Sequence, residues 1–247
     1  MNDKLPKITL AFWITKIAAT TLGETAGDLL AQTMNVGYAT STLILVGIFL
    51  VTLAAQLAVT KHHPWLYWTV IVSTSTAGTT MSDYLDRTLG LGYATGAAIL
   101  VTLLVAVLVA WRLSTGSLSV DRVTTRKAEI FYWIAILVSN TLGTALGDFL
   151  ADDSGLGFGI VALLLAAVIG VIVLLYFFTK ISRVALFWCA FVLTRPLGAT
   201  GGDFLTKSHE RGGLDLGTLN ASLVLLTILV VAIVWQMRTS ARAAATP

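Results

Sequence analysis

Residues 131–148 of the chain read FYWIAILVSNTLGTALGD, an apolar stretch that ends in glycines and an aspartate. Trp133 is followed ten residues later by Gly143 and fifteen residues later by Asp148. The same spacing occurs four times, starting from Trp13, Trp68, Trp133 and Trp188, with glycines at Gly23, Gly78, Gly143 and Gly198 and aspartates at Asp28, Asp83, Asp148 and Asp203. The pattern predicts four copies of one structural unit.

The composition of the chain indicates a membrane protein. Of its 247 residues, 56% are hydrophobic and 12% are charged, and the mean hydropathy is +0.85. Soluble domains carry about twice this share of charge, roughly a quarter of their residues. We therefore predict an all-α membrane protein rather than a soluble enzyme or binding domain.

Apolar segments long enough to cross a hydrocarbon core of ~30 Å, which takes roughly 20 helical residues, recur along the chain. They lie at residues 8–30, 38–59, 65–85, 93–111, 129–150, 157–178, 184–205 and 217–236. This predicts eight transmembrane helices in a single transmembrane domain over residues 1–247. The first segment carries the same pattern as the later ones, so we interpret it as a retained helix and not as a cleaved signal peptide.

The helices group into repeats. Successive aspartates of the pattern are 55, 65 and 55 residues apart, so each unit contains two helices and the extra ten residues fall in the middle of the chain. We predict helical hairpins at 8–60, 64–112, 128–180 and 183–237, with a cytoplasmic linker at 112–127. Units with an even number of helices keep the same orientation, so the repeats should be parallel, about an axis along the membrane normal.

The connections between the helices differ in charge. The termini and the connections on their side carry eleven Lys and Arg residues, and the opposite connections carry three. An excess of basic residues marks the cytoplasmic side. We therefore predict a multi-pass protein of the bacterial cytoplasmic (inner) membrane with both termini in the cytoplasm. Gly37, Gly92 and Gly157 begin the second helix of the first three units and are expected to adopt a positive φ there.

This arrangement resembles a family of bacterial integral membrane proteins with four tandem two-helix repeats, a characteristic Trp in each repeat and no assigned function. The resemblance covers residues 8 to 236. It depends on the Gly-to-Asp segments and on the pairs Phe12-Trp13, Tyr67-Trp68, Tyr132-Trp133 and Phe187-Trp188. It implies the architecture and no chemistry.

The aspartates are the main functional candidates. A charged side chain inside a transmembrane segment costs at least a few kcal/mol unless it is paired, protonated or hydrated. Glu24 lies one helical turn before Asp28, on the same face. The expected ion-binding groups are the carboxylates of Asp28, Asp83, Asp148, Asp203 and Glu24, the amide of Asn140 and the hydroxyls of Thr21, Thr76 and Thr141. The four aspartates are also the expected metal ligands.

Two basic residues, Lys16 and Arg195, fall within the same helices as these acids. With five acids against two bases, full ionisation would leave a net charge of −3. Arg195 either forms a static ion pair with one Asp or acts as an internal counter-ion that a substrate displaces. Lys16 invites the same two interpretations, with snorkelling toward the cytoplasmic interface favoured. Pro196 is expected to interrupt the hydrogen-bond ladder of its helix.

Oxygen ligands without imidazole or thiolate suit a proton, Na⁺, Mg²⁺, Ca²⁺ or Mn²⁺. We predict a membrane transporter for a hard cation such as Mn²⁺ or Mg²⁺ that works by export or proton-coupled exchange, with odd helices around a central polar cavity and even helices facing lipid. The alternative is a non-transporting membrane scaffold or sensor, in which the aspartates cap helix ends and the glycines allow close helix packing. No catalytic motif, cofactor site or nucleic-acid-binding pattern is present in the sequence, so the partners expected are the lipid bilayer, the cation and protons.

Overall fold

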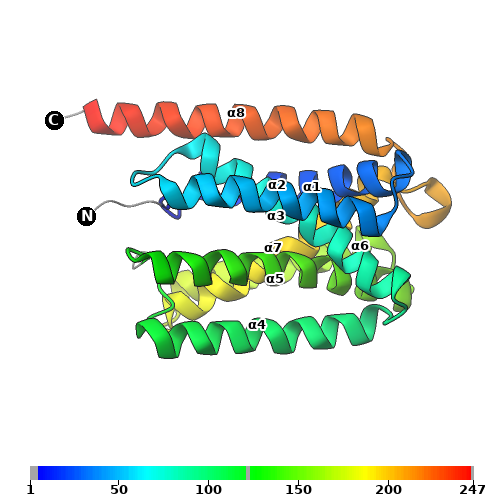
Figure 1. The fold of residues 1–247 in the computed structure, drawn as a ribbon, viewed down its shortest axis with the longest axis horizontal. Helices are drawn as coiled ribbons and strands as arrows, with labels where there is room; N and C mark the ends of the chain where they lie inside the picture. Colours follow the sequence, from blue (N-terminus) through cyan, green and yellow to red (C-terminus); the bar gives the residue numbers. More distant parts are fainter. Residues whose placement is uncertain (1–4, 121–122, 246–247) are drawn as a thin grey trace.

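A computed structural model describes residues 5–120 and 123–245, with side chains through residue 239. These residues contain eight α-helices and no strand, which confirms the predicted helix number and all-α class. The helices are α1 (Leu10–Asp28), α2 (Tyr38–Ala58), α3 (Pro64–Asp83), α4 (Tyr93–Thr115), α5 (Arg126–Asp148), α6 (Phe158–Phe178), α7 (Arg183–Thr206) and α8 (Thr218–Ala245). Helix α1 begins and α8 ends at the same end of the bundle (Figure 1).

The odd-numbered helices form a closed inner ring. Helix α1 packs against α3 and α7, and α5 packs against the same two helices on the opposite side. Each inner helix therefore has two inner neighbours. The ring order α1, α3, α5, α7 follows the order of the repeats and closes from the fourth repeat back to the first.

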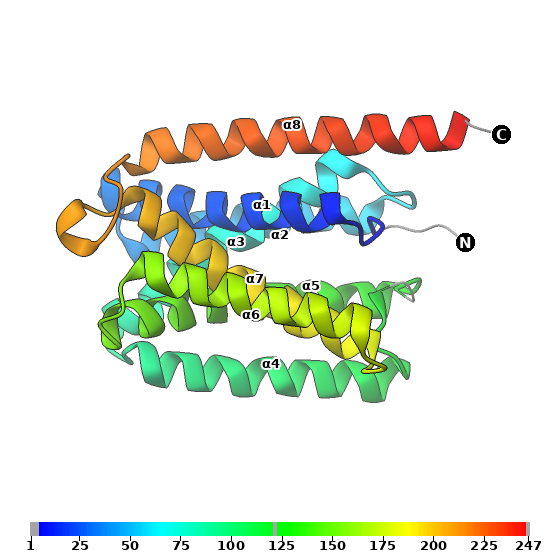
Figure 2. The ribbon, with the colours of Figure 1, turned by 180° about the vertical axis from the view of Figure 1, so that it is seen from behind.

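The even-numbered helices pack on the outside of this ring, and each lies mainly against the odd helix of the following repeat. Helix α2 packs on α3, α4 on α5, and α6 on α7. Helix α8, whose following repeat is the first one, packs along α1 (Figures 1 and 2). The two helices of one sequence repeat therefore make few contacts with each other, and every repeat is completed by its neighbour.

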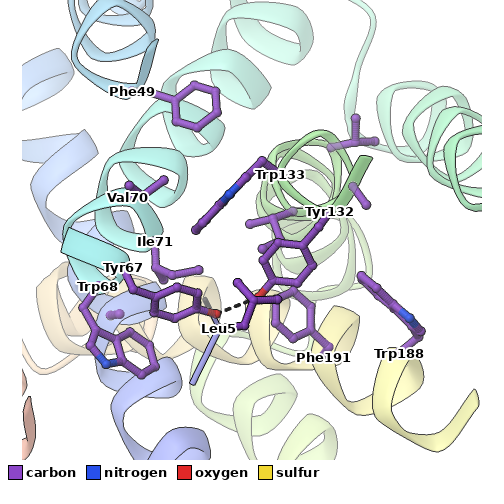
Figure 3. Packing of buried hydrophobic residues seen from close by; sticks show 14 of the residues in the cluster. Leu5, Phe49, Tyr67, Trp68, Val70, Ile71, Tyr132, Trp133, Trp188 and Phe191 are labelled. Carbon is purple, nitrogen blue, oxygen red and sulfur yellow. Dashed lines mark hydrogen bonds between the residues drawn. The ribbon is translucent and has the colours of Figure 1, made fainter. Parts of the chain in front are cut away.

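The repeated aromatic-Trp pairs close a ring of their own near the start of the odd helices. Each Trp packs against the other aromatic residue of the preceding repeat, with ring centroids 5.6 Å apart for Phe12–Trp68, 5.6 Å for Tyr67–Trp133, 6.5 Å for Tyr132–Trp188 and 5.7 Å for Phe187–Trp13. The hydroxyls of Tyr67 and Tyr132 point toward each other and are hydrogen-bonded at 2.7 Å (Figure 3). Such aromatic pairs stabilise by about 0.5–1.5 kcal/mol beyond the area they bury, so the pair that defines each repeat holds the ring together.

The repeated glycines let the odd helices approach closely. A Cβ atom on Gly23 would lie 2.2 Å from Ser75 Cβ, and one on Gly143 would lie 2.2 Å from Arg195 Cγ. The other two glycines of the pattern make the corresponding contacts: Gly78 lies against Asn140 and Gly198 against Thr20. All four meet the equivalent position of the next helix in the ring. The expected small-residue packing of helices is confirmed.

The ends of the odd helices differ between the repeats. The first three are each followed directly by a five-residue π-helical turn: η1 (Leu29–Thr33), η2 (Tyr84–Thr88) and η4 (Phe149–Asp153). In the fourth repeat α7 continues to Thr206, and a 3₁₀ turn, η5 (His209–Arg211), follows. The aspartates Asp28, Asp83 and Asp148 therefore each end an α-helix where a π turn begins, a feature often found at functional sites.

The glycines that precede the second helices adopt the predicted conformation. The φ angles are 80° at Gly37, 71° at Gly92 and 78° at Gly157. Glycine adopts positive φ without the steric cost that a side chain would add. Gly217, before α8, has a φ of 73° and so does the same in the fourth repeat.

Polarity in this bundle is the reverse of that in a water-soluble protein. Many Thr and Ser residues and most acids of the odd helices are buried, whereas large apolar side chains of the even helices are exposed, such as Leu43 at 76% and Phe178 at 82%. Six helices are long and apolar enough to cross a membrane: α2, α4, α5, α6, α7 and α8. The other two, α1 and α3, belong to the inner ring.

Candidate functional site

The inner ring carries polar residues at matching heights. Positions four apart lie on one face of a helix, and residues 20, 24 and 28 of α1 are such a series. Their counterparts in the other odd helices form three successive levels: Thr20, Ser75, Asn140 and Arg195; Glu24, Thr79, Thr144 and Ala199; and Asp28, Asp83, Asp148 and Asp203. All of these residues are buried.

Arg195 occupies the middle of the ring and has no exposed surface. Its Nη1 donates to Glu24 Oε2 at 3.0 Å. Its Nη2 donates to the hydroxyls of Thr79 at 2.6 Å and Thr144 at 2.9 Å. Weaker contacts reach the backbone carbonyls of Thr20 at 3.4 Å and Ser75 at 3.3 Å. A single guanidinium therefore contacts the other three odd helices.

Glu24 is the centre of the same network. Its Oε2 accepts hydrogen bonds from Thr79 at 3.1 Å and Thr144 at 3.0 Å, in addition to Arg195. The prediction that Arg195 pairs statically with an Asp is therefore wrong about the partner. Glu24 lies one turn closer to the level of Arg195 than Asp28 does. At this level, where the sequence predicts a central polar cavity, a network of polar side chains joins the four odd helices.

Pro196 does not end its helix. Helix α7 continues through it as one segment, Arg183–Thr206. Proline removes one backbone donor from the ladder. One carbonyl of this region, that of Thr194, accepts a hydrogen bond from the Thr20 hydroxyl of α1 at 3.4 Å. The carbonyl that loses its helical donor to the proline is that of Val192, four residues earlier, so the Thr20 contact adds a link between α1 and α7 beside the proline and does not replace the missing bond.

The four aspartates lie together at the far end of the ring, and each is only 2–3% exposed. Two of them share one basic residue. Arg87, in the η2 turn, places Nε 2.9 Å from Asp83 Oδ1 on its own segment. Its Nη2 donates to Asp148 Oδ2 at 3.2 Å on the next inner helix. We call these three residues the Arg87 clamp.

The other two aspartates share a lysine in the same way. Lys207 Nζ lies 3.1 Å from Asp203 Oδ1, four residues before it on α7. The same nitrogen donates to Asp28 Oδ2 at 3.1 Å on α1, the next helix of the ring. We call these residues the Lys207 clamp. Burial lowers the pKa of Lys207, but Asp203 and Asp28 outweigh this effect and raise the pKa above its usual value, so Lys207 is charged at neutral pH.

One corner of the ring brings three carboxylates together. Oxygen atoms of Glu24, Asp28 and Asp203 all lie within 4.8 Å of one another. Hard cations take carboxylate oxygens at about 2.0–2.6 Å, so oxygens at this separation can surround one such ion. Arg87, Lys207 and Arg195 add positive charge nearby. The carboxylates of Glu24, Asp28, Asp83, Asp148 and Asp203 are accompanied by four basic side chains, Lys16, Arg87, Arg195 and Lys207. The formal charges of these nine groups sum to −1, whereas the −3 expected from sequence left Arg87 and Lys207 out.

Lys16 does not snorkel to the interface. It is 1% exposed, and its Nζ lies 3.8 Å from the centroid of the Phe191 ring on α7. A cation over an aromatic face is attracted by the ring quadrupole. The favoured prediction is therefore wrong, because the side chain lies between inner helices and finds an aromatic partner there instead of reaching the bundle end.

The remaining predicted ligands lie away from the aspartates. The hydroxyls of Thr21, Thr76 and Thr141 donate to carbonyls of their own helices, at Ile17, Val72 and Leu137. The Asn140 amide donates to Thr74 at 2.9 Å and to Ser75 at 3.3 Å, and its Oδ1 is buried without a hydrogen-bond partner. In the described part of the chain, no hydrogen bond joins these four residues to an Asp of the ring.

Arg87 and Lys207 are two of the three basic residues that the sequence places in the outer connections, and their contacts with the aspartates were not predicted. The signal was present, because both stand four residues after an Asp of the pattern and so lie on the same helix face. Extending the repeat by one turn aligns them with Gln32 and Asp152.

Comparison with known proteins identifies the repeats. A family model described as a Repeat of Unknown Function (DUF347) matches four times, at residues 11–62, 66–117, 131–182 and 186–242. The match confirms the resemblance inferred from the repeated motif. No curated protein and no solved structure matches the chain.

Proposed function

This chain belongs to the DUF347 repeat family, and we propose that it is a membrane transporter for a hard cation, such as Mn²⁺ or Mg²⁺, that passes through the ring of odd helices. The single observation that carries this proposal is the set of five buried carboxylates, Glu24, Asp28, Asp83, Asp148 and Asp203, on an inner ring of helices that is surrounded by outer helices apolar enough to cross a membrane. A scaffold gains nothing from them, because Gly, Ala or Ser make helix contacts without the cost of burying a carboxylate.

The reversed polarity of the bundle supports its placement in a lipid bilayer. The outer helices α2, α4, α6 and α8 expose large apolar side chains along their length. Lipid would cover these faces, and the polar inner faces would be shielded from it. The distribution of basic residues favours the bacterial inner membrane with both termini in the cytoplasm. The four repeats would then be parallel, about an axis along the membrane normal.

In this proposal the corner of Glu24, Asp28 and Asp203 holds the ion. The carboxylate oxygens supply hard ligands, and Arg195 fixes Glu24 in place through its 3.0 Å contact. When the cation leaves, Glu24 keeps Arg195 as its partner, Lys207 supplies one positive charge to Asp28 and Asp203, and a proton on one of these aspartates would supply the second, since acids within a membrane are tolerable only when they are paired, protonated or hydrated. Release of the ion would thereby be coupled to proton uptake.

Ion flux into proteoliposomes tests the proposal. Wild-type protein is compared with Asp28→Asn and Asp203→Asn for H⁺, Na⁺, Mg²⁺, Ca²⁺ and Mn²⁺. The matched control is Asp152→Asn, which removes an exposed acid that lies four residues after Asp148. We expect a selective wild-type flux that both ring variants lose and the control keeps. Flux that persists in folded ring variants would remove the carboxylates from the mechanism.

A second candidate, a non-transporting scaffold or sensor, is favoured by the network around Arg195. That guanidinium fills the ring centre and links all four odd helices, as a structural crosslink would. A wild-type protein that is folded and moves none of the five ions would support this alternative. The same liposome experiment thus separates the two functions.

A further inference from the structure

Arg87 and Lys207 occupy equivalent places in the second and fourth repeats. Each touches its own Asp and the Asp of the next inner helix, at 2.9 and 3.2 Å for Arg87 and at 3.1 Å twice for Lys207. At the same position the first repeat has Gln32 and the third has Asp152. Going around the ring, positions with a cation alternate with positions without one.

The two bases lie on the outside of the carboxylates that they contact. The side chain of Arg87 is 30% exposed and that of Lys207 is 13% exposed, whereas the four carboxylates are at most 4% exposed. An ion approaching the aspartates from this end of the bundle therefore meets a positive charge before it meets a ligand. In this state the bases occupy positions at which a cation would bind.

Arg87 also contacts two aromatic residues in the same conformation. Its Cζ lies 6.0 Å from the ring centroid of Tyr38 and 5.6 Å from that of Tyr93, the first residues of α2 and α4. Its Nη1 donates to the Tyr38 hydroxyl at 3.4 Å. Aromatic faces at this distance attract a guanidinium. If the Arg87 side chain rotates away from Asp83 and Asp148, the rings of Tyr38 and Tyr93 remain within reach as partners.

We propose that Arg87 and Lys207 are built-in cations that hold the two aspartate pairs closed, and that a cargo cation binds by displacing them. The identity of the cargo rests on the proposed transport function, but the displacement itself is a binding property. It makes the two bases determinants of affinity and selectivity. A divalent ion can replace a tethered single charge on two carboxylates more effectively than Na⁺ can, because its attraction to each carboxylate is twice as strong at the same distance.

The test measures equilibrium Mn²⁺ binding to purified full-length protein in detergent. Arg87→Gln and Lys207→Gln copy the residue that the first repeat carries at Gln32. We expect each to raise Mn²⁺ affinity by about tenfold, within the 5–150-fold range of typical coupling between sites. Adding Asp148→Asn to Arg87→Gln should abolish the gain. Arg211→Gln, which removes an exposed outer charge outside both clamps, is the matched control and should bind as wild type.

Unchanged Mn²⁺ affinity in both folded Gln variants would overturn the proposal. If the Gln variants do not fold, Arg87→Lys keeps the charge but cannot contact both aspartates with a planar guanidinium, and it should still raise Mn²⁺ affinity about fivefold, the lower end of such coupling. No gain in that variant counts against the proposal. Gains in binding with no wild-type flux in liposomes would leave the clamps intact and refute transport. Wild-type flux with unchanged binding in the variants would refute the clamps alone.

Discussion

The ion pair between Arg195 and Glu24 yields the sharpest prediction about stability. Glu24→Gln keeps the shape of the side chain and its ability to accept from Thr79 and Thr144, but it leaves the Arg195 charge buried without a carboxylate. Arg195→Met does the reverse and retains much of the stem that packs on Gly143. The double variant removes both charges. The three proteins together form a double-mutant cycle.

The magnitude follows from the burial of both partners, 0% exposed for the Arg195 side chain and 3% for that of Glu24. Removing one member of a buried pair costs about 3–5 kcal/mol, whereas replacing both by well-packed neutral residues is often nearly neutral. We therefore expect each single variant to lose about 3–5 kcal/mol and the double variant to lose no more than about 2 kcal/mol. For a chain of this size each kcal/mol lowers Tm by about 2–4 °C, so the single variants should unfold about 6–20 °C earlier.

The assay is thermal unfolding in one detergent, followed by intrinsic tryptophan fluorescence, because Trp68 and Trp133 are buried near the start of the ring. Chemical unfolding in mixed micelles supplies the free energies for the cycle. A coupling energy of about 4 kcal/mol or more is expected from these losses. Losses that simply add in the double variant would refute the argument, since they would mean that the two side chains stabilise the ring independently.

Three further outcomes follow from the packing and the charge pattern. Gly143→Ala should destabilise by about 1–3 kcal/mol through overpacking, while Gly170→Ala, where an added Cβ meets nothing within 4 Å, should be neutral or slightly stabilising in the same unfolding assay. Tyr67→Phe should cost about 1–3 kcal/mol because it leaves the buried Tyr132 hydroxyl without its partner, measured against the wild type by the same method. Asp152→Cys, in a background with Cys189→Ala, should react with a membrane-impermeant maleimide added outside intact cells. Labelling only after lysis would place Asp152 in the cytoplasm and reverse the predicted topology.

Helix number and the turn glycines were predictable because each depends on local chemistry. A run of about twenty apolar residues predicts a helix that can span a membrane, and a glycine before a helix predicts a positive φ, as found at Gly37 and Gly157. The packing of each even helix on the following repeat was not predictable. It depends on which neighbour covers a face, and the apolar faces of α2, α4 and α6 carry no local mark of their partner.

The site was predicted in composition but not in pairing. Burial of Asp28, Asp83, Asp148 and Asp203 on one ring follows from their equal places in the repeats. The partner of Arg195 depends instead on how far a long side chain reaches across the ring, which spacing along one helix does not specify. Lys16 was misjudged for the same reason, since its aromatic partner comes from a helix 175 residues further along the chain.

The contacts that hold the ring together occur in all four repeats, whereas most of the buried charges occur in only one or two of them. The aromatic-Trp pairs and the close-packed glycines occur in all four copies, and each makes the same contact with its neighbour. The charges other than the aspartates do not repeat: one copy has Glu24, another has Arg195, and the clamps occur in alternate copies. A purely structural ring would have no reason to break its own symmetry at buried charged positions. Two of these departures, Arg195 and Lys207, contact the corner of Glu24, Asp28 and Asp203, whereas Arg87 contacts Asp83 and Asp148. This division favours one asymmetric ion position at that corner over four equal ones.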